Sequence, residues 1–174
     1  SMRPVGLQNI TDGSSNTIAM SERNWVPEFG IRNALGEDIR NVTFVAVSSV
    51  NTNPGSCYAR ASGNRAMSGQ VKYRFGSLWC DGQAERVGFN TVLPPNAPSC
   101  VNDGNVNADA NGGILNATSN HPGGVNAVFA DSSVHFINQN INTGNKAFPP
   151  SGPGIGSPYG VWGALGSIDG GETI

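Results

Sequence analysis

The chain has 174 residues, a mass of 18.0 kDa and a formal net charge of -2, and only 13% of its residues are charged. This length suits a single domain over residues 1–174. Ten basic residues spread along a weakly acidic chain give no electrostatic footprint for nucleic acid or anionic lipid, so these partners are excluded. The 24 Gly and 11 Pro predict a β protein rich in turns and loops rather than a helical one.

The start of the chain carries no targeting signal. It has neither a basic stretch followed by an apolar one nor an apolar run of about 18 residues, which a membrane-spanning helix needs. The first two residues, Ser1-Met2, are typical of the remnant of a cleaved tag. We therefore expect a natural N-terminal segment to be missing from this sequence.

In the first third of the chain, two segments have the alternation of β-strands. Asp12-Gly13 forms a turn signal before residues 17–22, whose alternating pattern predicts a half-buried strand. Residues 25–36 have no sustained period and are expected to form a loop. Residues 39–47 are apolar on both faces, which predicts a central strand that is covered on both sides.

Two more short strands are expected in the middle of the chain, at residues 70–75 and 88–93. The second should end at Pro94-Pro95, because proline cannot donate a ladder hydrogen bond. Three arginines in this region are interpreted as solvated surface residues rather than as an anion site: Arg60, Arg65 and Arg74.

Three cysteines, Cys57, Cys80 and Cys100, lack the close spacing of a zinc site or of a Cys-x-x-Cys redox motif. In an oxidising compartment they would form one disulfide and leave one free thiol. Pairing of Cys57 with Cys100 and pairing of Cys80 with Cys100 both remain open.

Oxygen-bearing side chains alternate in a polar loop at Asn107, Asp109 and Asn111, before Gly112. This spacing partly matches a calcium-binding loop, but Thr118 stands where the bidentate Glu is needed. We therefore favour an ordinary Asn-rich loop without a cofactor and keep calcium as the weaker alternative.

Residues 119–137 contain both histidines and have the pattern of a β-hairpin. A two-residue turn at Asp131-Ser132 would pair Phe129 with Val134 and would place Phe136 on the buried face. Ser132 at the position that favours glycine should cost about 1 kcal/mol or force a longer, bulged loop.

His121 and Asp131 are candidates for an acid-base pair, but a strand between them would separate them by roughly 17–20 Å. Both are therefore expected to have structural roles at the two turns. Near the C-terminus, residues 148–158 should form an extended surface segment, and residues 161–165 a short helix that packs Trp162 on the core.

Several motifs together resemble a bacterial family of pilin-like surface proteins known as prepilin-type processing-associated, or domain of unknown function 1559. They are the run Ile10-Thr11-Asp12-Gly13-Ser14-Ser15-Asn16-Thr17, residues 89–96 with Pro98-Ser99-Cys100, His121 followed nine residues later by Asp131, and residues 161–165 followed by Gly170-Gly171-Glu172. The chain departs from the family in having Asp131-Ser132 where the family has Asp-Gly. This departure affects the expected geometry of the hairpin turn more than the assignment to the family.

The resemblance implies a mainly β, pilin-like C-terminal domain whose sheet is antiparallel, or an α+β fold if an N-terminal helix absent here is counted. It also implies export, tethering to the cell surface through that helix, and an oxidised cysteine pair. His121, Asp131, Asp12 and Gly13 are the motif residues, and they are expected to be structural. The family supplies no catalytic residues.

From these observations we expect a non-enzymatic extracellular domain of a surface filament or secretion-related assembly. Its partners would be other pilin-like subunits or components of the same assembly, and it would meet the membrane only through the absent helix. The alternative is a surface-displayed module that binds a small molecule or a glycan by stacking on Trp25 or Trp79.

Overall fold

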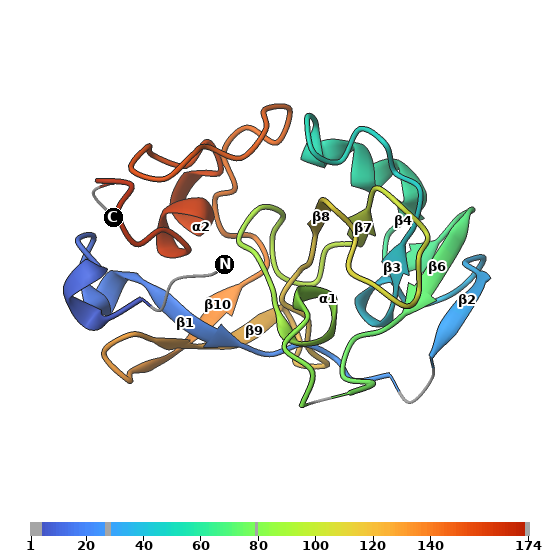
Figure 1. Cartoon of the computed structure of the whole chain (residues 1–174), viewed down its shortest axis with the longest axis horizontal. Coiled ribbons are helices and arrows are strands. Elements are labelled where there is room, and N and C mark those ends of the chain that lie inside the picture. Colours follow the sequence, from blue (N-terminus) through green and yellow to red (C-terminus); the bar gives the residue numbers. More distant parts are fainter. Residues whose placement is uncertain (1–4, 27–28, 79, 173–174) are drawn as a thin grey trace.

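The computed structural model describes residues 5–26, 29–78 and 80–172, and the statements below concern these parts of the chain. They form a mainly β structure with few helices, as predicted. Figure 1 shows a three-stranded and a five-stranded sheet lying side by side along the long axis of the molecule. Within the described ranges, no helix has both the length and the apolar character needed to cross a membrane.

The three-stranded sheet joins one strand near the start of the chain to a hairpin that lies more than a hundred residues later. Its order is β1 (Ile18–Ser21), β9 (Gly124–Phe129) and β10 (Val134–Asn138), and all pairs are antiparallel. One face packs against α2 (Gly160–Leu165), the predicted short helix. The fully buried Trp162 of this helix donates a hydrogen bond from Nε1 to the Leu93 carbonyl at 2.8 Å.

The five-stranded sheet is mixed rather than wholly antiparallel. Its strands in spatial order are β2 (Gly30–Asn33), β6 (Gln70–Tyr73), β3 (Thr43–Phe44), β7 (Ser99–Val101) and β8 (Gly113–Ile114). Only β3 and β7 are parallel. Because β3 lies in the middle with both of its residues buried, the prediction of a central covered strand is confirmed.

The central strand is shorter than predicted. The Asp38 side chain accepts a hydrogen bond from the Arg40 N–H at 3.0 Å and starts the 3-10 helix η3 (Ile39–Asn41). Ala46 has a φ of 55°, a left-handed conformation that cannot continue a strand. The Asp38 side-chain bond at one end and the left-handed Ala46 at the other therefore limit the strand to Thr43–Phe44, although the apolar pattern of residues 39–47 predicts nine residues.

Short elements complete the described fold: η1 (Leu7–Asn9), η2 (Ser14–Asn16), η4 (Pro54–Arg60), the two-stranded ribbon of β4 (Ala61–Ser62) and β5 (Arg65–Ala66), and α1 (Ala84–Val87). The expected strand at residues 88–93 is wrong. The Asn90 N–H donates to Leu115 and the Leu93 carbonyl accepts from Trp162, so these backbone groups meet single partners instead of a ladder. Strand β2 falls inside the expected loop at residues 25–36 and was missed.

The β9–β10 hairpin exists, but its predicted register is wrong by one residue. The loop has three residues, Ala130 to Ser132: the Phe129 N–H donates to the Ser133 carbonyl, the Ser132 N–H donates to the Phe129 carbonyl, and Ser132 has a φ of 72°. This is the bulged loop that serine at the glycine position favours. Val128 therefore pairs with Val134 and Asn126 pairs with Phe136.

A one-residue shift turns every β10 side chain to the other face of the sheet. Phe136 and Val134, which were expected in the core, are 50% and 63% exposed, while Ile137 is buried. The apolar character of β10 is therefore displayed on the surface.

The cysteines form the pair Cys57–Cys100, with a Cα–Cα distance of 5.9 Å, and Cys80 is a free, exposed thiol. The expected disulfide is thus present, and the structure selects one of the two pairings left open. The bond ties η4 to the central part of the five-stranded sheet, and both cysteines are fully buried.

Candidate functional site

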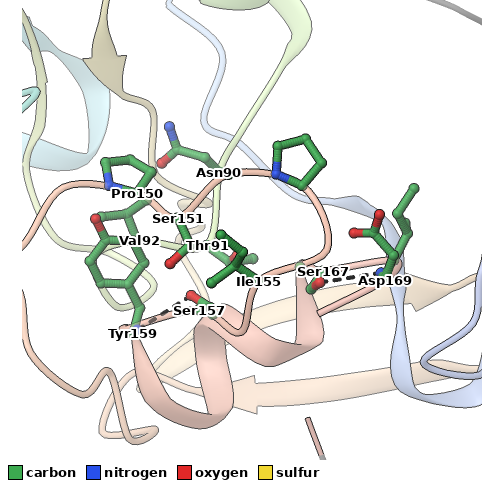
Figure 2. A pocket seen from close by; sticks show the side chains of 15 residues that line it. Asn90, Thr91, Val92, Pro150, Ser151, Ile155, Ser157, Tyr159, Ser167 and Asp169 are labelled. Carbon is green, nitrogen blue, oxygen red and sulfur yellow. Dashed lines mark hydrogen bonds between the residues drawn. The ribbon is translucent and has the colours of Figure 1, made fainter. Parts of the chain in front are cut away.

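An open cleft of about 380 Å³ lies beside α2. Three segments line it: residues 90–92, residues within 150–159, and residues within 163–169 (Figure 2). Two of these segments carry motifs of the family resemblance, and the Pro- and Gly-rich segment between them is the expected extended surface segment. The walls are mostly apolar, with Val92, Pro150, Pro153, Ile155 and Ile168.

The polar groups of this cleft are largely engaged with their own loops. The Tyr159 hydroxyl donates to the Phe148 carbonyl at 2.9 Å, and burial raises the pKa of Tyr159 to about 12, so this phenol stays protonated. Figure 2 shows the Ser157 and Ser167 hydroxyls facing the backbone of Tyr159 and Asp169, from which they accept hydrogen bonds. The cleft therefore offers an apolar recess rather than an aligned nucleophile and base.

The motif residue Asp12 fastens the C-terminal motif at the same end of the molecule. Its two carboxylate oxygens accept hydrogen bonds from the N–H groups of Gly170 and Gly171 at 2.8 and 2.9 Å. Burial raises the pKa of Asp12, but these N–H groups together with Ser167 lower it more, so its pKa lies below the usual value. Gly13, with a φ of 96°, supplies the left-handed turn that follows the carboxylate.

Asp131, in the hairpin turn, bonds the N-terminal motif (residues 10–17) that contains Asp12. Its N–H donates to the Ser14 carbonyl at 3.1 Å, and its carboxylate accepts from the Ser133 N–H and hydroxyl at 2.9 and 2.6 Å. These bonds from Ser133 are the main reason why the pKa of Asp131 is lowered. Motif segments that are more than a hundred residues apart in sequence thus form one bonded cluster.

His121 lies at the opposite end of β9 from Asp131. Its Nε2 is 3.2 Å from Glu22 Oε1, and the other Glu22 oxygen accepts from the Asn126 N–H at 2.8 Å. Burial raises the pKa of Glu22, while the bonds from Asn126 and the nearby imidazole lower it to a greater extent. His121 therefore contacts Glu22 and not Asp131, which follows the other end of β9.

A second group of charged residues is buried between β6 and α1. Lys72 of β6 and Arg74, which directly follows this strand, are only 1% and 2% exposed. Lys72 Nζ lies 2.8 Å from the Glu85 carboxylate, and Arg74 donates to the Val106 carbonyl at 2.9 Å and lies 3.5 Å from Asp109. The interpretation of Arg74 as a solvated surface residue is wrong, because loop 102–111 covers it.

Asp109, the one carboxylate of the weak calcium pattern, caps α1. Its oxygens accept from the N–H groups of Ala84 and Glu85 at 2.7 and 3.2 Å. Asn107 uses its own N–H to bond the Asn105 side chain at 2.9 Å. In the described ranges no group of three His, Cys, Asp or Glu side chains converges as a metal site would require. Calcium binding by Asn107, Asp109 and Asn111 stays the untested, weaker alternative, and its one carboxylate is already engaged.

A family model described as a protein of unknown function, DUF1559, matches residues 1–144. The chain belongs to the DUF1559 family. The match covers the Thr-Asp-Gly motif, residues 89–100 and the span from His121 to Asp131, whereas the C-terminal motif lies beyond it. No curated protein and no solved structure matches the chain.

In this DUF1559 domain the motif residues named from sequence are found in two places. Asp12, Gly13 and Asp131 come together near the C-terminal glycines, and His121 lies apart with Glu22. Sequence reasoning missed the buried Lys72–Glu85 pair. The available signal was the spacing of Lys72 and Arg74 at i and i+2 in the strand expected at residues 70–75, which would put both charges on one face.

Proposed function

We propose that this DUF1559 domain is a non-enzymatic, pilin-like domain that acts outside the cytoplasm in a cell-surface filament or secretion-related assembly. Its partners are other pilin-like subunits or components of that assembly. In the full-length protein, an N-terminal helix tethers it to the membrane.

The observation that carries the proposal is the buried Cys57–Cys100 disulfide. Disulfides of this structural kind persist in oxidising compartments and are rare where thiols are kept reduced. The bond joins η4 to strand β7 and both of its cysteines are fully buried, so it stabilises the fold rather than serving as an accessible redox centre.

A non-enzymatic role is supported by the use that the fold makes of its charged groups. Asp12 holds the C-terminal glycines, Asp109 caps α1, Glu85 pairs with Lys72, and Glu22 bonds the backbone of β9. A catalytic carboxylate needs a lone pair or a proton available to substrate. These four carboxylates instead accept hydrogen bonds or form ion pairs within the fold.

Fractionation of the full-length protein tests the proposal, with thiol accessibility measured in parallel. We expect the protein in the envelope or surface fraction, and we expect maleimide to label one cysteine per chain before reduction and three after it. Purely cytoplasmic protein, with all three thiols reactive after denaturation alone, would contradict it.

The alternative, a module that binds a small molecule or a glycan, is favoured by one observation. The Trp25 side chain is 65% exposed and is held in place by a hydrogen bond from Nε1 to the Gly76 carbonyl at 3.1 Å. An immobilised indole suits stacking on a sugar ring. Trp79, the other expected stacking residue, lies outside the described residues. Glycan-array binding that is lost in Trp25→Ala and retained in Trp25→Phe would support this second function.

A further inference from the structure

The free edge of β10 differs from the other sheet edges in the described part of the chain. Natural sheets protect exposed edges with charged residues, proline, bulges or very short strands. Strand β1 has a register shift between Ile18 and Met20, β2 carries Arg32, and β8 has only two residues. Strand β10 has five residues in regular register and none of these protections.

The β10 segment is also uncharged and displays apolar side chains. From Ser132 to Asn145 the sequence has no Asp, Glu, Lys or Arg. Val134 and Phe136 stand on the outer face of the sheet beside Met20, which is 67% exposed, and the half-buried Val128. Gly124 leaves room for the Phe136 ring, since a Cβ at position 124 would lie 2.9 Å from its Cζ.

The hydrogen-bond pattern shows which backbone groups face the free edge. On either side of β10, the Phe129 N–H donates to the Ser133 carbonyl and the Gln139 N–H donates to the Gly123 carbonyl. The backbone groups of odd-numbered residues along this segment therefore point toward β9. Because antiparallel residues alternate, the N–H and C=O groups of Val134 and Phe136 point away from β9. The same holds for Asn138, whose carbonyl already accepts from the Ile141 N–H at 3.0 Å.

We propose that β10 pairs antiparallel with β10 of a second copy of this chain, about a two-fold axis at Phe136. Phe136 then exchanges both backbone hydrogen bonds with Phe136 of the other copy, and Val134 faces Asn138. The two three-stranded sheets become one continuous sheet, with their Phe136 rings side by side on its outer face.

A second copy fits this edge for two reasons. Antiparallel pairing about a two-fold axis matches the strand with one of its own length, whereas the other edges described here are bulged, charged or shorter. Residues 132–145 carry no Asp, Glu, Lys or Arg, although the chain as a whole has a net charge of -2. Two copies that pair along this segment therefore place no like charges opposite each other. The contact is smaller than a standard interface, so we expect a dissociation constant on the order of 100 µM.

This inference names a partner for the assembly role proposed above and rests on that role, but its test is separate. Sedimentation of the purified domain up to about 1 mM should show the mean mass rising toward twice 18.0 kDa. Phe136→Lys should abolish the rise, and Val134→Lys is a second variant at an exposed position. Leu35→Lys, which adds the same charge at a 73% exposed position beyond β2, should associate like the wild type.

Amide hydrogen exchange by NMR separates strand pairing from association through side chains alone. With rising concentration, protection should increase at least fivefold at Val134 and Phe136, while His135 and Ile137, whose amides bond β9, change little. A wild-type domain that stays monomeric at the highest concentration, or folded Lys variants that associate as before, would refute the inference. A surface-located but monomeric protein would refute this inference alone and leave the proposed function standing.

Discussion

Removal of the Cys57–Cys100 disulfide should cost this protein a large part of its stability. The two cysteines are 43 residues apart, and closing a loop of that length lowers the entropy of the unfolded chain by about 13 cal/mol/K. At 25 °C this corresponds to about 4 kcal/mol of unfolding free energy. Domains of this kind have a total of roughly 5–15 kcal/mol, so the loss should be easily measured.

The measurement is urea unfolding of a Cys57→Ala/Cys100→Ala double variant on a Cys80→Ala background. The background removes the exposed thiol, which otherwise forms wrong disulfides when one partner is missing. Cys80→Ala alone is the control and should shift the unfolding free energy by less than about 0.5 kcal/mol, as surface substitutions do.

A loss below about 1 kcal/mol in the double variant would refute the reasoning, because it would mean that the bond does not restrain the unfolded chain. If the double variant does not fold, unfolding of the Cys80→Ala protein with and without dithiothreitol gives the same comparison. The expected result there is again a destabilised reduced form.

Three further predictions concern single contacts. Asp12 has a folded-state pKa below its unfolded value, so its contribution is present above about pH 4 and is lost as the pH falls through the folded pKa. The stability gap between wild type and Asp12→Asn should therefore be about 1–2 kcal/mol in urea unfolding at pH 6 and should shrink progressively as the pH is lowered below about 4. Ser132→Gly should stabilise the protein by about 0.5–1 kcal/mol because it removes the left-handed strain at φ 72°, and an unchanged melting temperature would count against the bulged turn. Lys72→Met should cost about 3 kcal/mol in urea unfolding, because it removes the nearer of the two cations beside the buried Glu85 and leaves only Arg74 at 3.9 Å. Lys72→Met/Glu85→Gln should recover much of that loss, and no recovery would show that Lys72 and Glu85 do not act as a unit.

The arrangement of motifs explains why so little of the site is visible in the linear sequence. Asp12 and Gly171 are at opposite ends of the chain, yet they are joined by a hydrogen bond of 2.9 Å. The cleft next to them is lined by residues 90–92 together with residues within 150–169, which are far apart in the sequence. Spacing along the chain carries no information about such contacts, because loops are positioned by the sheets and helix that they connect.

The sequence by itself determined the β character, the strands at residues 18–21 and 70–73, the helix around Trp162 and the position of the hairpin, because alternation, turn residues and caps are local signals. It also placed His121 and Asp131 at opposite ends of one strand, since strand length follows from residue count. The tertiary structure decided which cysteine pairs with Cys100, because that choice depends on which loop packs beneath the sheet.

Only the tertiary structure revealed that Arg74 is buried, because a loop distant in sequence supplies its acceptors. It also decided the β9–β10 register, where one left-handed residue, Ser132, adds a position to the turn and reverses the face of every β10 side chain. Alternation along the strand is the same in both registers, so the pattern alone could not say that Phe136 faces outward. That single choice in the turn creates the uncharged, apolar edge on which the proposed pairing depends.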